Sequence, residues 1–137
     1  MKIRCAKSLT PEKTYKTTLD SVELNTTREG KKFVALNLSH DGVPVRTTMF
    51  WVNNEIAEEI FCNQFASQFD DLYAEYKSLK DFLVAANKHK GDQIIIRYIK
   101  ETWTVSDLAG VETEHSRFAP CIDLDRLMQE DPGFFAT

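Results

Sequence analysis

The spacing of apolar side chains changes twice along the chain, and this change most narrowly limits the fold. Residues 15–52 alternate apolar and polar side chains, which predicts strands, with a phase shift at Asp20-Ser21 that predicts a β-bulge. Over residues 53–90 the apolar side chains recur at three- and four-residue steps, as in helices that pack on a core. Alternation returns at Gln93. The sequence therefore predicts strands, a helical insert and further strands.

Polar turns divide the two β-rich regions into separate strands. Asp41-Gly42 suits a tight hairpin turn, because Asp-Gly readily supplies positive φ. Ile94-Ile95-Ile96 is apolar on both faces, which predicts a central strand. The first three strands are expected to form an antiparallel meander. The predicted strands are residues 15–24, 33–38, 43–52, 93–104 and 111–122.

The segment between the third and fourth strands carries helix signals. Asn53 or Asn54 can cap a first helix, and Ser78 with Asp81 forms a capping box for a second. This element order predicts a mainly β protein with a helical insert, an OB-fold-like five-stranded antiparallel barrel with the helix between strands 3 and 4. Other small β-barrel topologies stay open. The predicted core stripe of the insert contains Ile56, Ile60, Phe61, Phe65, Phe69, Leu72, Tyr73, Tyr76, Leu79, Phe82, Leu83 and Ala86.

Length and composition exclude several classes of protein. With 137 residues the chain has the size of one domain, expected over residues 1–122, followed by an acidic C-terminal segment at 123–137. Three scattered cysteines without a C-x-x-C pair predict free thiols in a reducing compartment, the cytoplasm. We expect no secretory signal and no membrane span. Because the histidines do not cluster and no phosphate loop or nucleophile motif is present, we expect no metal, no cofactor and no enzymatic activity.

Basic residues concentrate in the predicted strands. The formal net charge of -4 divides into +4 over residues 1–50, -5 over 51–87, +2 over 88–105 and -5 over 106–137. A basic sheet can hold a polyanion even in an acidic protein, because local potential steers binding more than total charge does. Ordinary scatter of surface charge is the alternative interpretation.

Several short motifs lie along the chain: Lys90-Gly91-Asp92, Ile94-Ile95-Ile96, Trp103, Asp107, Gly110, Phe50-Trp51, Ala57-Glu58 and an acidic end with Pro132, Phe134 and Phe135. Together they resemble bacterial and phage single-stranded DNA-binding proteins (SSBs). In that family a helix ends in Lys-Gly-Asp, and an aliphatic strand, a Trp and an Asp-containing turn with Gly follow. The helical insert is longer here, and residues follow the last aromatic. The resemblance therefore implies a divergent phage- or plasmid-like member that acts in DNA replication or recombination.

A single-strand binder needs a positive groove and exposed aromatic rings on which bases stack. Basic and aromatic residues interleave on the predicted strands, so we expect binding with little sequence specificity. Phe50, Trp51 and Trp103 could instead belong to the barrel core, because the sequence leaves open which face of the third strand is buried. The candidate nucleic-acid-binding residues are Lys32, Phe33, Arg46, Phe50, Trp51, Arg97, Lys100 and Trp103.

The C-terminal segment has a separate expected role. Its acids cannot favour a polyanion, so we expect a mobile tail that competes with DNA or offers Asp131, Phe134 and Phe135 to a replication or recombination protein. Alternatively, Leu124, Leu127 and Met128 could pack on the barrel as a last helical turn. A rival function class is a non-enzymatic interaction module, a viral adaptor or inhibitor that uses an acidic helical surface. A homo-oligomer is compatible with either function.

Overall fold

The protein is described by a computed structural model that covers residues 3 and 5–136. The elements follow the predicted order, in which a run of strands is followed by a helical insert and further strands, and the insert lies between the third and fourth strand positions. The bounds are β1 Thr14–Thr26, β2 Lys32–His40, β3 Val43–Pro44, β4 Thr48–Trp51, α1 Glu55–Ala66, η1 Asp70–Leu72, α2 Leu79–Ala86, η2 Asn87–His89, β5 Gln93–Ser106, β6 Glu112–Cys121, α3 Leu124–Glu130 and α4 Pro132–Phe135.

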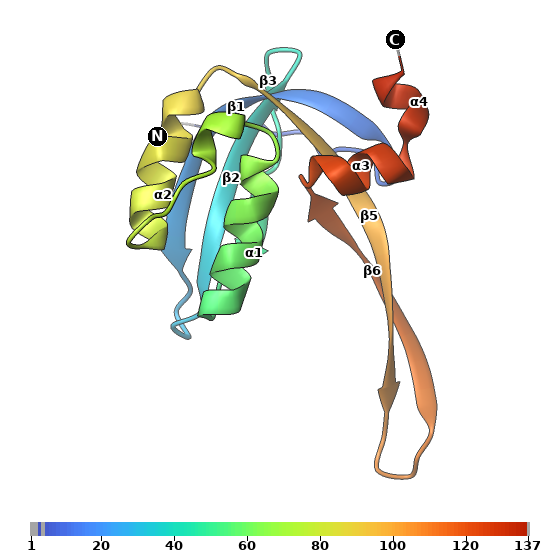
Figure 1. Ribbon diagram of the computed structural model, residues 1–137. Helices are drawn as coiled ribbons and strands as arrows, with labels where there is room; N and C mark the ends of the chain where they lie inside the picture. The colour runs from blue at the N-terminus through green and yellow to red at the C-terminus, as the bar shows by residue number, and fades with distance from the viewer. Residues whose placement is uncertain (1–2, 4, 137) are drawn as a thin grey trace.

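The strands form one antiparallel, strongly curled sheet (Figure 1). The strand order is β3-β2-β1-β5-β6. Strand β4 also pairs with β2, along the part of β2 that β3 does not reach, so β3 and β4 together occupy the third strand position. The described strands show no backbone pairing between β4 and β6. The Thr48 and Tyr98 hydroxyls instead lie 2.8 Å apart across this opening. The fold is thus a mainly β, OB-like half-barrel, as predicted.

Local sequence signals account for the meander. The register of β1 against β2 shifts between Leu19 and Ser21, which is the predicted bulge. The turn between β2 and β3 places Asp41 at φ 52° and Gly42 at φ 77°, the left-handed conformation that this dipeptide tolerates. The predicted third strand is wrong in one respect: it breaks at Arg46-Thr47, which belong to neither β3 nor β4.

The core lies between the curled sheet and the helical insert, where α1 and α2 lie side by side over β1 and β2 (Figure 1). Phe61, Phe65 and Phe82 from the helices meet the inward side chains of the strands. The predicted stripe is wrong at three positions: Ile56, Ile60 and Tyr73 are 73%, 52% and 59% exposed. The side of α1 that faces the sheet carries Phe61, Phe65 and Ala66, so Ile56 and Ile60 lie on its exposed side. Because α1 ends at Ala66, Tyr73 lies beyond it in irregular chain.

Strands β5 and β6 extend far beyond the sheet as a two-stranded arm (Figure 1). Their pairing continues from Arg97–Cys121 to Ser106–Glu112, and the tip is an Asp107–Gly110 turn, as predicted. The Asp107 carboxylate accepts hydrogen bonds from the N–H groups of Ala109 and Val111 at 2.8 and 2.9 Å. The arm therefore has a defined turn although its side chains from Thr102 to Phe118 are exposed.

The C-terminal segment packs on the outer face of β5 rather than forming the mobile tail of the first expectation. Leu127 of α3 is fully buried against Ile99 and Cys121, with Phe135 of α4 beside them. The Asp131 carboxylate, between the two helices, accepts a hydrogen bond from the Thr14 hydroxyl at 2.8 Å. Apolar burial and this polar contact together hold the segment against the sheet. The segment thus follows the alternative expectation, a last helical turn that packs on the barrel.

A histidine joins the helical insert to the start of β5. The two ring nitrogens of His89 each lie 2.9 Å from a carboxylate, Asp71 on one side and Asp92 on the other. The ring also stacks on Phe69, with centroids 4.0 Å apart. Burial lowers the pKa of His89, but the bonds to Asp92 and Asp71 outweigh it, so the pKa is raised. The Lys90-Gly91-Asp92 motif thus serves the fold.

We expect the stability of the protein to fall as the pH rises through the pKa of folded His89. The imidazolium donates to both carboxylates, whereas neutral imidazole can donate to only one. Because the pKa is raised on folding, this stabilisation is complete below about pH 6.5, the ordinary histidine value, and is lost above it. Thermal melts between pH 5.5 and 9 should show the loss in the wild type and a flatter profile in His89→Gln. Equal profiles would contradict the assignment.

Candidate nucleic-acid interface

An aromatic pair lies on the outer face of the sheet, the face opposite the core. Pairing of β2 with β4 sets Phe33 opposite Trp51 and Ala35 opposite Met49, while Val34 between them points into the core. The Phe33 and Trp51 rings meet edge to face, with centroids 5.7 Å apart. Trp51 remains 44% exposed and Met49 41% exposed. Ring faces are therefore accessible to a planar ligand.

Basic side chains border this aromatic pair. The β1–β2 loop ends beside Phe33, and it carries Arg28 and Lys31 before Lys32 begins β2. Lys31 lies 3.9 Å from Glu29, but both side chains are largely exposed, so the pair neutralises little. Across the part of the chain that the structure describes, no carboxylate lies within ion-pair distance of Arg28 or Lys32. Arg28 and Lys31 thus stand close to Phe33 in the sequence, while Lys32 alternates with Phe33 and has the face of Val34.

The predicted residue Arg46 lies toward the other end of β2. It is exposed in the break between β3 and β4, and its backbone N–H donates to the Lys7 carbonyl at 2.9 Å. From Lys32 to His40 strand β2 spans about 26 Å at 3.3 Å per residue. Basic residues therefore occur at both ends of an exposed strip, and Trp51, Phe33 and Met49 occupy one part of it.

Phe50, a predicted stacking residue, faces the core instead. It pairs with inward Val34, and its ring lies 5.2 Å from that of Phe61. The sequence could not fix this orientation, because the break at Arg46-Thr47 resets the alternation of the strand. Of the two adjacent aromatics only Trp51 is outward.

Arg97 is not free for a phosphate. Its side chain is 15% exposed and its guanidinium lies 3.3 Å from the Asp131 carboxylate and 3.1 Å from the Thr14 hydroxyl. From the sequence, Asp131 is expected in a segment that docks on a partner protein. In the structure its carboxylate instead pairs with Arg97 of the same chain. Arg97 and Asp131 therefore join β5 to the C-terminal helices.

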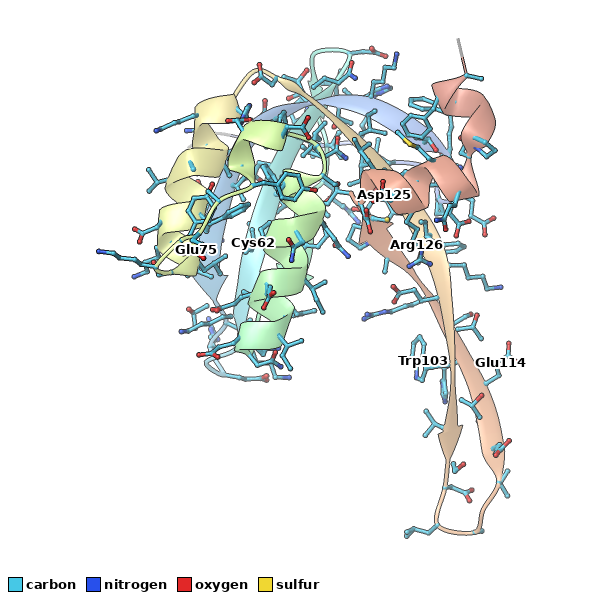
Figure 2. All side chains as sticks on the ribbon, viewed as in Figure 1. Cys62, Glu75, Trp103, Glu114, Asp125 and Arg126 are labelled. Atoms are coloured by element: carbon cyan, nitrogen blue, oxygen red, sulfur yellow. The ribbon has the colours of Figure 1, made fainter. Side chains whose placement is uncertain are left out.

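The two other predicted residues of β5 lie away from the aromatic pair, on the arm. Trp103 projects from its free part (Figure 2), where it stacks on His115 at 5.9 Å and meets the Arg117 guanidinium at 5.9 Å. Lys100 points to the opposite face, across from Phe118. Trp103 and Lys100 thus do not share a surface with Phe33 and Trp51.

The predicted apolar docking tip is also engaged. The Phe134 and Phe135 rings contact each other with centroids 5.2 Å apart. Phe135 packs against the cluster around Leu127, and the Lys16 ammonium lies 5.7 Å from the Phe134 ring. Both rings are half-buried on the protein itself.

Two thiols have raised pKa values. Burial, with added repulsion from Glu58 and Glu59, raises the pKa of Cys62 to about 11, and burial also raises the pKa of Cys121. Neither is an activated nucleophile at neutral pH. Figure 2 shows Cys62 on α1, on the helical side of the molecule. Within residues 3 and 5–136 no group of three or more His, Cys, Asp or Glu side chains could hold a metal ion.

Sequence reasoning missed Met49, Arg28 and Lys31 as members of this surface. The two basic loop residues were visible as charges next to Phe33, but Met49 required the β2–β4 register. No family model matches the chain, and no curated protein matches its sequence. None of the described helices is long and apolar enough to cross a membrane.

Proposed function

We propose that the protein binds single-stranded DNA with little sequence specificity along the outer face of β4 and β2. The observation that carries this proposal is the Phe33–Trp51 pair on the outer face, in which Trp51 is exposed and Phe33 is half-buried. An accessible ring face can stack on a base, and base–aromatic stacking contributes about 1–3 kcal/mol per base. Every base has a π-face, so this contact tolerates any sequence.

The charge distribution supports a nucleic-acid ligand on this face. Arg28 and Lys31 precede Phe33 in the β1–β2 loop, whereas α1 carries Glu55, Glu58 and Glu59 on the other side of the molecule. A strand on the sheet therefore avoids this acidic helix, and it passes one exposed carboxylate, that of Glu23 on β1 opposite Ala35. The surface is a strip of the curled sheet without a projecting basic helix, which favours a splayed single strand over duplex grooves. We place this activity in DNA replication or recombination, with a phage- or plasmid-encoded SSB as the working model.

We expect Trp51→Ala to weaken binding of a fluorescein-labelled dT oligonucleotide about fivefold to 150-fold, which corresponds to one lost stacking contact. Phe33→Ala should have a similar effect. Anisotropy titrations at one fixed salt concentration measure both. Because Trp51 is 44% exposed, the variant should keep its fold, which circular dichroism checks.

The matched control is Trp103→Ala, which removes an exposed tryptophan on the arm and should leave affinity near wild type. In a Trp103→Phe background, quenching of Trp51 fluorescence by DNA reports the contact directly. If Trp51→Ala binds DNA as the wild type does, the outer face is not the interface. If the wild type binds no DNA at low salt, single-strand binding is wrong.

One observation favours the second function class, a protein-interaction module. Ile56 and Ile60 stand exposed one turn apart on α1, among Glu55, Glu58 and Glu59. An apolar pair ringed by acids suits a partner with a basic rim around an apolar patch. Absence of DNA binding, together with loss of partner capture in Ile56→Ser/Ile60→Ser, would favour this function.

A further inference from the structure

Basic side chains converge at the His40 end of β2, far from the aromatic pair. The Lys7 ammonium lies 2.6 Å from His40 Nδ1, and because an ammonium can only donate, this nitrogen accepts. The His40 ring meets the Tyr15 ring edge to face at 5.1 Å. The Lys13 ammonium lies 5.2 Å from the same Tyr15 ring. The segment that leads into β1 and the end of β2 thus bring two lysines to one tyrosine.

The electrostatic effect of both lysines is felt at Tyr15. Hydrogen bonding from the Thr10 side chain lowers the pKa of Tyr15 most, burial opposes this effect, and the hydrogen bond that the Thr10 N–H donates to the phenolic oxygen lowers the pKa further. The positive charges of Lys13 and Lys7 lower the pKa further. Lys13 thus lies directly over the Tyr15 ring, and Lys7 reaches the same ring through His40.

Little negative charge offsets this cluster. Asp41 lies 3.6 Å from His40 Nε2, but its side chain is 84% exposed. In the described ranges, 3 and 5–136, no carboxylate lies within ion-pair distance of Lys7, Lys13 or Arg46. Arg46 adjoins Lys7 through the backbone hydrogen bond between them. The cluster thus has donors and positive charge available for an anion.

We propose that Lys7, Lys13 and Arg46 form a phosphate-binding site that anchors the DNA strand whose bases stack on Phe33 and Trp51. This inference rests on the proposed function, since it assigns phosphate contacts to the same bound strand. Phe33 and His40 are seven residues apart on β2, about 23 Å at 3.3 Å per residue, and the alternation that turns Phe33 outward places His40 on the face of Val34 and Tyr15. A bound strand therefore has to reach from the rings to the cluster, and oligonucleotides shorter than about 4 residues, the low end of OB-fold sites, should bind weakly.

Inorganic phosphate tests the site without DNA. Added phosphate should shift the NMR resonances of His40 and Tyr15 in the wild type but not in Lys7→Gln/Lys13→Gln. The control Lys77→Gln/Lys80→Gln removes the same charge from the helical side and should respond as the wild type does. Circular dichroism establishes that each variant is folded.

DNA titrations at several salt concentrations test the anchor. Each lost phosphate contact lowers the salt slope of single-strand binding by about 0.7, so the Lys7→Gln/Lys13→Gln variant should lose about 1.4 units. The quenching of Trp51 at saturation should be retained. A terminal phosphate carries more negative charge than an internal diester, so a 5′- or 3′-phosphorylated oligonucleotide should show whether a strand end occupies the site. Tighter binding of one phosphorylated form assigns an end, and equal binding assigns an internal diester.

The outcomes separate this inference from the proposed function. If Trp51→Ala weakens DNA binding while Lys7→Gln/Lys13→Gln keeps the wild-type slope, the anchor is wrong and the stacking face stands. If phosphate shifts His40 and Tyr15 but the wild type binds no DNA, the strand is excluded as the source of phosphate and both proposals fall. Loss of the phosphate response and the slope change only in the Lys7→Gln/Lys13→Gln variant would establish the anchor.

Discussion

Removal of residues 123–137 is expected to destabilise the protein severely. The truncation deletes Leu127, which is fully buried against Ile99 and Cys121, and exposes the outer face of β5. Loss of a buried leucine side chain alone costs about 2–5 kcal/mol, against a typical total stability of about 5–15 kcal/mol. The truncation also leaves the largely buried Arg97 without Asp131. Urea unfolding of full-length and truncated protein measures the loss.

Three point variants separate the contributions of individual side chains to this loss of stability. Leu127→Ala should account for most of the loss, whereas Met128→Ala, 46% exposed on the same helix, should change stability by less than about 0.5 kcal/mol. Asp131→Asn keeps the shape but removes the charge facing Arg97, so it should fall between them. If the truncated protein melts at the wild-type temperature, α3 is dispensable and the segment is a tail after all.

The parts of the fold that could be predicted from sequence are those fixed by neighbouring residues. The bulge at Leu19–Ser21, the Asp41-Gly42 turn and the Asp107–Gly110 turn all follow from local backbone preferences. The cap at Ser78 is equally local, since its hydroxyl accepts from the Asp81 N–H within one turn. Element order followed from these signals, and the OB-like half-barrel followed from the order.

The orientation of individual side chains in the candidate site was less predictable. Phe50 and Trp51 are adjacent and both aromatic, so only the β2–β4 register decides that one is in the core and the other exposed. Arg97 and Asp131 are 34 residues apart, and no local pattern pairs them. Exposed charges such as Lys32 and Arg46 were predictable because burial of an unpaired charge is costly.

The helical insert shows why a regular apolar spacing can mislead. Phe65 and Phe69 are four residues apart, but only Phe65 belongs to α1. Phe69 lies beyond the helix, where its ring stacks on His89. Tyr76 also lies outside any helix, and its hydroxyl donates to the Leu72 carbonyl at 2.8 Å. Each aromatic has a tertiary contact of its own, so their common spacing does not indicate one continuous helix.

Phe65→Ala is expected to cost about 3–5 kcal/mol of folding stability, enough to leave a marginal domain partly unfolded at 37 °C. Phe65 is fully buried, and its ring centroid lies 5.9, 5.6 and 6.0 Å from those of Phe61, Phe69 and Phe82. The surrounding rings are anchored on separate elements, so the cavity cannot close by a small shift. Tyr73→Ala is the matched control, because Tyr73 is 59% exposed in the same insert and should change stability by less than about 0.5 kcal/mol. Chemical denaturation of both variants compares two arrangements of the insert. A continuous amphipathic helix would place both residues on its buried stripe and make both substitutions costly, whereas the observed end of α1 at Ala66 makes only Phe65→Ala costly.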